Sequence, residues 1–274
     1  MIFETHTLTQ PLSDHIESIF HFKGFKPDHS IERVVPTGHL FIIFELDGFK
    51  RNTYNNETLE PNDEFTKVWI SGMHKNYLSI SAHEDSEMLV IQFKPNGPYP
   101  FLHIPIQELN DIVISSEKLF GDGLIKLRQD IISVNESSEK FKLVEQWLLN
   151  RFEEKNVPPK ELVVILLQIQ NLSKLDNKKI ISSYTNSQKH LISQFKKYFG
   201  LTPKVFQRIY RFNQILATIR NKQHLNWADI AYEFEYSDQS HFIREFREFC
   251  GFNPQEFIKA GHQNDEPNFF PLDR

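Results

Sequence analysis

The strongest constraint on this chain is an internal repeat near its C-terminal end. The pattern His190-Leu191-Ile192-x-x-Phe195 returns 51 residues later as His241-Phe242-Ile243-x-x-Phe246. The same offset relates five further pairs of like residues: Gln188 and Gln239, Lys196 and Arg247, Gly200 and Gly251, Pro203 and Pro254, and Phe206 and Phe257. Repetition at one fixed offset identifies a structural unit that is used twice.

Each copy is predicted to be an amphipathic helix with defined ends. Apolar residues recur at helical spacing and form one buried stripe per copy, made of Leu191, Phe195 and Phe199, and of Phe242, Phe246 and Phe249. Ser187 starts the first helix and Ser237 or Asp238 the second, because these side chains can cap a free N–H group. Gly200 and Gly251 end them, since glycine adopts the left-handed C-terminal conformation without strain.

The segment between the copies is predicted to contain one long helix and then a helix-turn-helix. The pattern of Pro203–Arg220 is helical throughout, and its 18 residues span roughly 27 Å at about 1.5 Å per residue. Such a rod could hold two helices in successive turns of a DNA major groove, about 34 Å apart. Trp227–Glu233 reads as a short helix and residues 234–236 as a tight turn, so the second copy completes a helix-turn-helix.

This C-terminal run resembles the second helix-turn-helix of AraC/XylS-type transcription regulators. The matching residues are Ala228-Asp229-Ile230-Ala231, Tyr236-Ser237-Asp238-Gln239-Ser240-His241-Phe242, Phe246, Gly251-Phe252-Asn253-Pro254 and Phe257. The resemblance covers about residues 175–260 and implies a DNA-binding domain of two helix-turn-helix units with a linker helix, attached to a separate sensor domain. Two positions depart from the family pattern. Glu235 replaces the usual turn glycine, so we expect a wide or strained turn, and Ile180-Ile181 replaces a small residue, which makes the first unit the weaker reader.

The first 120 residues are predicted to form a β-rich sensor domain. Strand-like runs at 40–46, 66–71, 77–81 and 88–93 are separated by turn formers, a spacing typical of a small barrel or sandwich, of which a cupin-like fold is one form. Three segments resemble an uncharacterised domain found in the sensor position of some AraC-type regulators: Arg33–His39, Gly72-Met73 and Phe93–Gly97. The predicted fold class is therefore α+β, with a β-rich domain, a helical linker and an all-α domain.

Four regions follow from these patterns. Residues 1–120 are the sensor domain, and residues 121–174 are helices that join the halves or form a dimer surface. Residues 175–260 are the DNA-binding domain. Residues 261–274 are predicted to be a flexible tail, although Phe269-Phe270 could dock it.

Charge is distributed unevenly between these regions. The chain carries a net charge of −5, yet residues 175–260 contain 13 Lys and Arg against 8 Asp and Glu. A basic module on an acidic partner domain is typical of a DNA-binding regulator. The single cysteine, Cys250, suits a reducing cytoplasm. No signal peptide is read, and the longest apolar run, Leu162–Leu167, is too short for a membrane span.

The polar faces of the two repeated helices are the predicted DNA-contacting surfaces. Glutamine and arginine make bidentate contacts to adenine and guanine edges, whereas lysine and arginine also bind phosphates. The predicted base-reading residues are Gln188, Lys189, Ile192, Ser193, Gln239, Ser240, His241 and Arg244. The predicted phosphate-binding residues are Lys196, Lys197, Arg208, Arg211 and Arg247. A solvated polar face is the competing interpretation, which the duplication with a spacer disfavours.

No motif for catalysis or metal binding is found. The chain has twelve histidines, including His39, His74, His83 and His103 in the β-rich part, but no His-x-His and no His-Glu-x-x-His pair. We therefore expect no catalytic residue, no metal and no cofactor. The expected partners are double-stranded DNA, an unknown small-molecule effector, a second copy of the chain and, for an activator, RNA polymerase. Two alternatives stay open: an enzyme with an unrecognised active site in the β domain, and a protein–protein interaction module.

Overall fold

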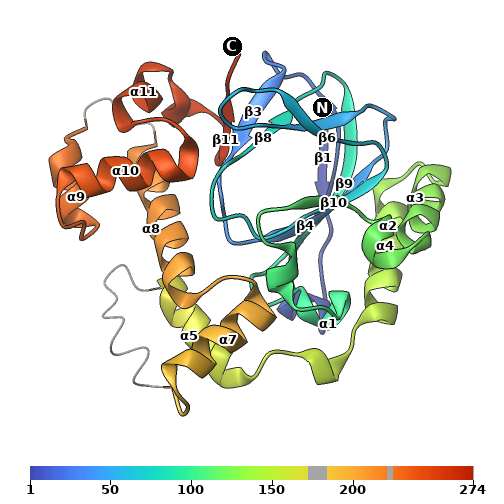
Figure 1. Ribbon diagram of the computed structural model, residues 1–274. Coiled ribbons are helices and arrows are strands. Elements are labelled where there is room, and N and C mark those ends of the chain that lie inside the picture. The colour runs from blue at the N-terminus through green and yellow to red at the C-terminus, as the bar shows by residue number, and fades with distance from the viewer. Residues whose placement is uncertain (172–183, 221–224, 274) are drawn as a thin grey trace.

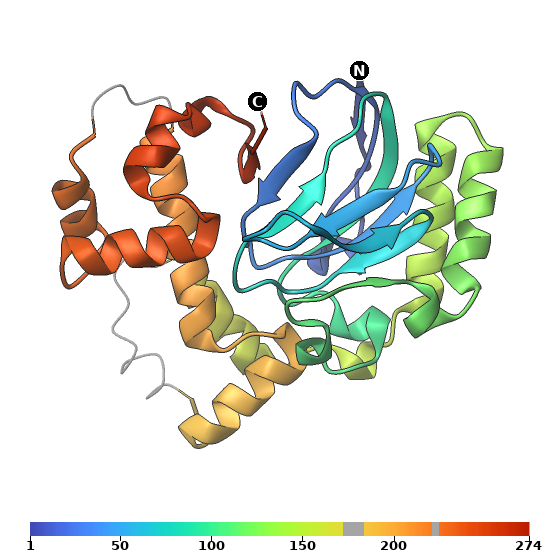
Figure 2. The same cartoon turned by 45° about the horizontal axis from the view of Figure 1, so that its top comes forward.

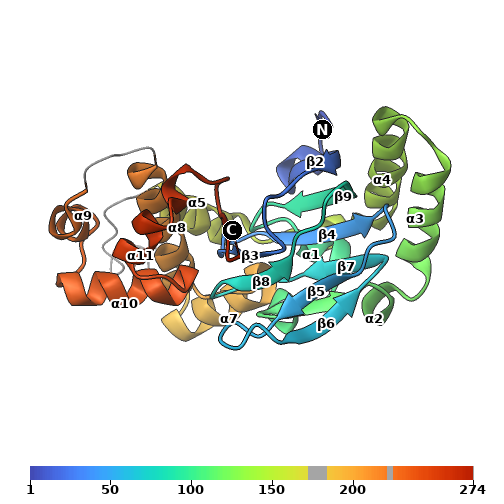
Figure 3. The same ribbon diagram turned by 90° about the horizontal axis from the view of Figure 1, so that it is seen from above.

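The computed structural model describes residues 1–171, 184–220 and 225–273. Figure 1 shows two β-sheets at the centre, with one group of helices on one flank and the C-terminal helices on the other. The view from above in Figure 3 separates the same three parts. The predicted α+β class is confirmed.

Both sheets are antiparallel. Their strands lie within the first 115 residues, except for one strand near the C-terminal end. One sheet has the order β1-β2-β9-β4-β7-β10, and the other has the order β11-β3-β8-β5-β6. The strands are β1 Ile2–Thr5, β2 Ile16–Phe25, β3 Ile31–Val34, β4 Leu40–Glu45, β5 Arg51–Tyr54, β6 Pro61–Phe65, β7 Val68–Ser71, β8 Leu78–Ser81, β9 Ser86–Phe93, β10 Val113–Ser115 and β11 Phe269–Pro271. We call them the six-stranded and the five-stranded sheet.

Strand β4 shows how the sandwich is filled. Its alternate residues Ile42 and Phe44 are fully buried in the large core that the flanking helices share. Ile43 points to the opposite face and packs in a smaller cluster with Trp69 of the same sheet and Phe65 of the other. Both faces of the six-stranded sheet are therefore covered, which explains the nearly continuous apolar run of this strand.

The four strands predicted from sequence are β4, β7, β8 and β9, with ends shifted by up to two residues. The longest strand, β2, was not predicted. Its pairing with β9 is interrupted by register shifts between Ile16 and Ser18 and between Lys23 and Phe25. A bulge breaks the two-residue alternation of side chains, and that alternation is the sequence signal of a strand.

The helices fall into two groups. The first group is α1 Tyr99–Leu102, α2 Glu117–Phe120, α3 Gly123–Ser133, α4 Ser137–Arg151 and α5 Lys160–Asn171. The second group is α7 Gln188–Phe199, α8 Pro203–Ile219, α9 Trp227–Glu233, α10 Gln239–Cys250 and α11 Pro254–Lys259. Within residues 1–171, 184–220 and 225–273, none of the helices combines the length and the apolar character needed to cross a bilayer.

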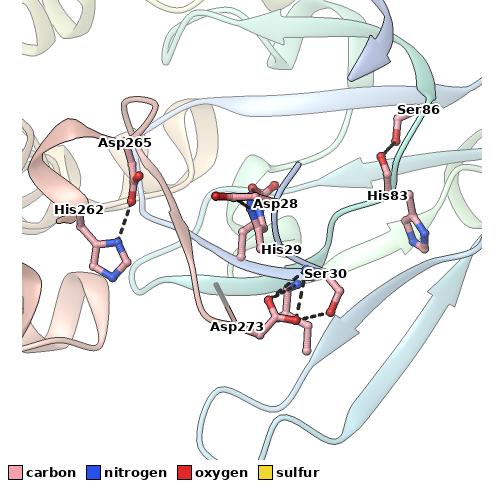
Figure 4. Close-up of polar contacts among 10 residues, drawn as sticks. Asp28, His29, Ser30, His83, Ser86, His262, Asp265 and Asp273 are labelled. Atoms are coloured by element: carbon pink, nitrogen blue, oxygen red, sulfur yellow. Dashed lines mark hydrogen bonds and ion pairs between the residues drawn. The ribbon is translucent and has the colours of Figure 1, made fainter. Parts of the chain in front are cut away.

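The C-terminal segment returns to the β-rich half. Strand β11 pairs with β3, where Phe269 lies opposite Val34, and Phe270 is buried with its ring centre 4.9 Å from that of Phe257. The Asp273 carboxylate accepts hydrogen bonds from the backbone N–H groups of Ser30 and Ile31, each at 3.0 Å, as Figure 4 shows for Ser30. The prediction of a flexible tail is therefore wrong, and the docking through Phe270 is what occurs. The C-terminal segment is held in place because it pairs with the open edge of β3 and because it buries the Phe270 ring.

Candidate nucleic-acid interface

Helix α7, the first of the two repeated helices, has the ends that the sequence predicts. The Ser187 hydroxyl accepts from the His190 N–H at 3.3 Å and caps the first turn. Leu191, Phe195 and Phe199 are fully buried, and Gly200 ends the helix at φ 82°. The helix predicted before it, around Lys178 to Ser183, lies outside the described residues.

Helices α9 and α10 form the second helix-turn-helix. The Asp238 carboxylate accepts from the His241 N–H at 2.7 Å, so it is Asp238 that caps α10. This bond holds the pKa of Asp238 below its ordinary value. Glu235 in the turn has φ 56°, in the left-handed region that glycine occupies freely. The strained turn expected from the missing glycine is therefore present.

Helix α8 lies between the two repeated helices. Its cap is Thr202, whose hydroxyl accepts from the Val205 N–H at 3.3 Å, and Pro203 is its first residue. It has 17 residues and is therefore about 26 Å long. In Figures 1 to 3, α7 and α10 both run from the outer side of the molecule toward the β-rich half. The first turns of both helices therefore lie away from the β-rich half.

The predicted base-reading residues all lie in the first half of α7 or of α10. Six are exposed: Gln188, Lys189, Ser193, Gln239, Ser240 and Arg244. Ile192 and His241 are half-buried. His190 and His241 occupy equivalent positions and each has a similar neighbour. His190 Nδ1 is 2.8 Å from the Tyr184 hydroxyl, and His241 Nδ1 is 3.2 Å from the Ser237 hydroxyl.

The predicted phosphate-binding residues divide into two classes. Lys196 and Arg247 are exposed. Lys197 is half-buried, and its ammonium lies 4.9 Å from the ring centre of Tyr198 and 5.3 Å from that of Tyr99 in the β-rich half. Arg208 and Arg211, by contrast, point at a carboxylate inside the helical domain.

That carboxylate belongs to Glu245 on α10, which the sequence reasoning missed. Arg208 Nε donates to it at 2.7 Å, Arg211 Nη2 at 2.6 Å and the Tyr236 hydroxyl at 2.6 Å. Burial alone would raise the pKa of Glu245, but these donors and the two positive charges outweigh it and hold the pKa below its ordinary value. Arg208 and Arg211 therefore bind α8 to α10 and are not free for phosphates in this arrangement.

The histidines considered as metal ligands each have a hydrogen-bond partner. His39 Nδ1 donates to the Phe93 carbonyl at 2.8 Å, and His103 Nε2 lies 2.9 Å from the Pro100 carbonyl. His74 and His83 lie 3.0 Å from the hydroxyls of Ser71 and Ser81 respectively. Across the described parts of the chain, no group of three or more His, Cys, Asp or Glu residues is placed to hold a metal ion.

Comparison with known proteins agrees with this geometry. Residues 184–260 match a family of helix-turn-helix domains, and residues 5–115 match a domain of unknown function, DUF6597. Residues 184–260 therefore form an AraC-type helix-turn-helix domain, which supports a role in DNA binding and regulation. The resemblance drawn from the repeat is thereby confirmed.

Solved structures of similar arrangement come from Vibrio cholerae. Apo ToxT is 12% identical, with 88% of this chain and 96% of that chain covered and a TM-score of 0.45. Unsaturated fatty acid bound ToxT is 12% identical, with coverages of 88% and 93% and a TM-score of 0.41. A third ToxT structure is 12% identical, with coverages of 94% and 98% and a TM-score of 0.40. No curated protein sequence matches this chain significantly.

Proposed function

We propose that this regulator reads two adjacent major-groove segments of one duplex, with α10 as the principal reader and α7 as the second. The observation that carries the proposal is a row of exposed and half-buried side chains, polar except for Ile192, in the first half of each helix. On α10 the row is Gln239, Ser240, His241 and Arg244; on α7 it is Gln188, Lys189, Ile192 and Ser193. Glutamine and arginine in the first half of a recognition helix are suited to adenine and guanine edges.

Phosphate contacts are assigned to Lys196, Lys197 and Arg247, which flank these rows. They position the protein on the duplex and make its affinity depend on salt. Arg208 and Arg211 are left out of this set, because Glu245 engages both guanidinium groups. Their role is to hold α10 against α8.

The β-rich half is assigned the regulatory role. An effector or a second subunit bound there would change how the helical domain engages DNA, and an activator would also contact RNA polymerase. We assign no catalytic step to the chain, and we place it in the cytoplasm, where its single buried thiol, Cys250, stays reduced.

The test begins with selection of genomic fragments by the full-length protein. Binding of the enriched duplex is then compared for wild type, Gln239→Ala and Arg244→Ala. Loss of a bidentate base contact costs about 1–3 kcal/mol and relaxes the sequence preference at one position. Matched controls are Gln255→Ala and Lys259→Ala, which change exposed side chains of similar chemistry on the neighbouring helix α11.

Salt dependence separates the two kinds of contact. Arg247→Ala should weaken binding to all sequences alike and reduce the slope of log affinity against log salt by about one. If the full-length protein enriches no motif and its affinity for duplex DNA is insensitive to salt, the proposal is wrong. The repeats would then be surfaces for another protein.

A further inference from the structure

Both repeated helices end against the β-rich half, and they do so at equivalent residues. Gly200 ends α7 and Gly251, 51 positions later, ends α10. Each glycine has a positive φ, and each is in close contact with side chains from the β-rich half. The repeat therefore extends beyond the DNA-facing side to a shared docking position.

The contact at Gly200 is made by the segment around the short 3-10 turn Ile106–Leu109. The Asn110 amide Nδ2 donates to the Gly200 carbonyl at 2.8 Å. A Cβ atom on Gly200 would lie 2.9 Å from Met73 Cγ and 3.0 Å from Ile106 Cγ2, too close for a normal contact. The chain thus approaches the β-rich half at this point as closely as only glycine permits.

The contact at Gly251 is made by Arg33 on β3. A Cβ atom on Gly251 would lie 2.6 Å from Arg33 Nη1. The guanidinium carbon lies 4.7 Å from the ring centre of Tyr77 in the β-rich half and 4.3 Å from that of Phe252, which follows α10. Both distances are within the range of a cation–π interaction, so one cation links a ring from each half. The positive charge also lies at the carbonyl end of α10, where the helix dipole favours it.

Helix α8 is fixed between these two contacts. The Asn213 amide donates to the Pro36 carbonyl at 2.9 Å, and the ring atom Cε1 of Phe206 would lie 3.3 Å from a Cβ on Gly38. The β-rich half therefore contacts α8 and the C-terminal ends of α7 and α10, and Figure 2 shows the helical domain beside the sheets.

We propose that Arg33 and Asn110 are positioning residues for DNA binding, through which the β-rich half sets the spacing and angle between the two recognition helices. This rests on the proposed function. The two major-groove segments lie about 34 Å apart, so simultaneous reading requires a fixed separation of the helices. Within the helical domain, α8 is connected to α10 through the ion pairs of Arg208 and Arg211 with Glu245. The two docking contacts supply a second, rigid connection.

The direction of the helices favours positioning over occlusion. Both contacts are at C-terminal ends, whereas Gln188 and Gln239 are the first residues of α7 and α10, Arg244 lies in the first half of α10, and all three are exposed. The β-rich half thus leaves the reading rows uncovered. Docking of this kind fixes the two recognition helices before they contact DNA, which reduces the cost in free energy of ordering them on binding.

The experiment uses the full-length protein and a duplex that the wild type selects from a randomised library. The spacing between its two half-sites is then changed in single base-pair steps from two fewer to two more. Affinity for each duplex is measured for wild type and for Arg33→Ala/Asn110→Ala. The control is Lys75→Ala, which breaks an exposed ion pair with Asp111 beside Asn110 and leaves the helical domain untouched. Thermal denaturation checks that each protein is folded, and Tyr77→Ala replaces Arg33→Ala if the latter does not fold.

The wild type and Lys75→Ala should prefer one spacing sharply. The double variant should bind that duplex about tenfold more weakly, in the range typical of coupled sites, and should differ less between spacings. A purely structural weakening would lower affinity at all spacings alike and would overturn the proposal, as would an unchanged profile. Tighter binding at every spacing would mean that the β-rich half opposes DNA binding, which also overturns it. Failure of the wild type itself to bind any duplex would instead remove the proposed function.

Discussion

Glu245→Gln tests whether the carboxylate between α8 and α10 holds the second reader in place. The Glu245 side chain is only 3% exposed, while those of Arg208 and Arg211 are 27% and 20% exposed. Removing one partner of a fully buried ion pair costs about 3–5 kcal/mol. The arginines are partly solvated, Arg208 retains Glu248, and glutamine still accepts one hydrogen bond. We therefore expect a loss of about 2–3 kcal/mol in the free energy of unfolding.

The matched control is Glu248→Gln. Glu248 pairs with the same Arg208 at 2.6 Å, but its side chain is 44% exposed. Exposed pairs contribute about 0–1 kcal/mol, so the control should change stability little. Both variants are compared with wild type by urea unfolding of the full-length protein, followed by far-ultraviolet circular dichroism. The reasoning is refuted if Glu245→Gln costs no more than Glu248→Gln.

The pH dependence provides a second check on the same residue. The pKa of Glu245 is lower in the folded protein than in the unfolded chain. Its stabilisation is therefore complete above the unfolded pKa of about 4.3 and is lost as pH falls through the folded value. The difference between wild type and Glu245→Gln should be constant near neutral pH and should shrink below about pH 4.

Three further predictions concern other residues. Glu235→Gly should raise stability by about 1 kcal/mol, because glycine relieves the strain at φ 56°. Glu233→Gly, at the last residue of α9, should instead lower stability, and urea unfolding measures both. Burial lowers the pKa of His74 to about 4, so the stability of the wild type should fall as the pH drops from about 6.5 to 4. The His74→Gln variant should lose less stability over that range, by up to about 3 kcal/mol. Thermal denaturation at a series of pH values measures the difference. Burial raises the pKa of Cys250 to about 12, so iodoacetamide should label the native thiol far more slowly than the unfolded one at pH 8, as mass spectrometry would detect.

Local features of the helical domain could be predicted from the sequence. The caps Ser187 and Asp238, the glycines Gly200 and Gly251 and the strained Glu235 all depend on residues within a few positions of one another. Backbone conformation at a helix end is set by such neighbours, so the sequence pattern is sufficient.

Contacts between distant segments could not be predicted in this way. The sequence predicts that Arg208 and Arg211 bind phosphates, because nothing local reveals their partner Glu245, which is 37 and 34 positions away on another helix. Glu245 itself lies among the buried residues of α10, where a charged side chain is uncommon without a partner. A carboxylate on the apolar stripe of a predicted helix was the available signal. The docking of Arg33 and Asn110 on the glycines had no such signal.

The pairing of β11 with β3 links the five-stranded sheet to the order in which the chain is synthesised. β3 leaves the ribosome early, but its outer edge obtains a backbone partner only after α7 to α11 have been translated. During that interval the nascent chain exposes unpaired N–H and C=O groups, which can pair with a neighbouring nascent chain on the same polysome. A chain truncated before β11 would keep every predicted DNA-reading residue and would leave the edge of β3 permanently open. Chaperones and proteases would then act on the exposed edge of β3, although the missing residues lie far from β3 in the sequence.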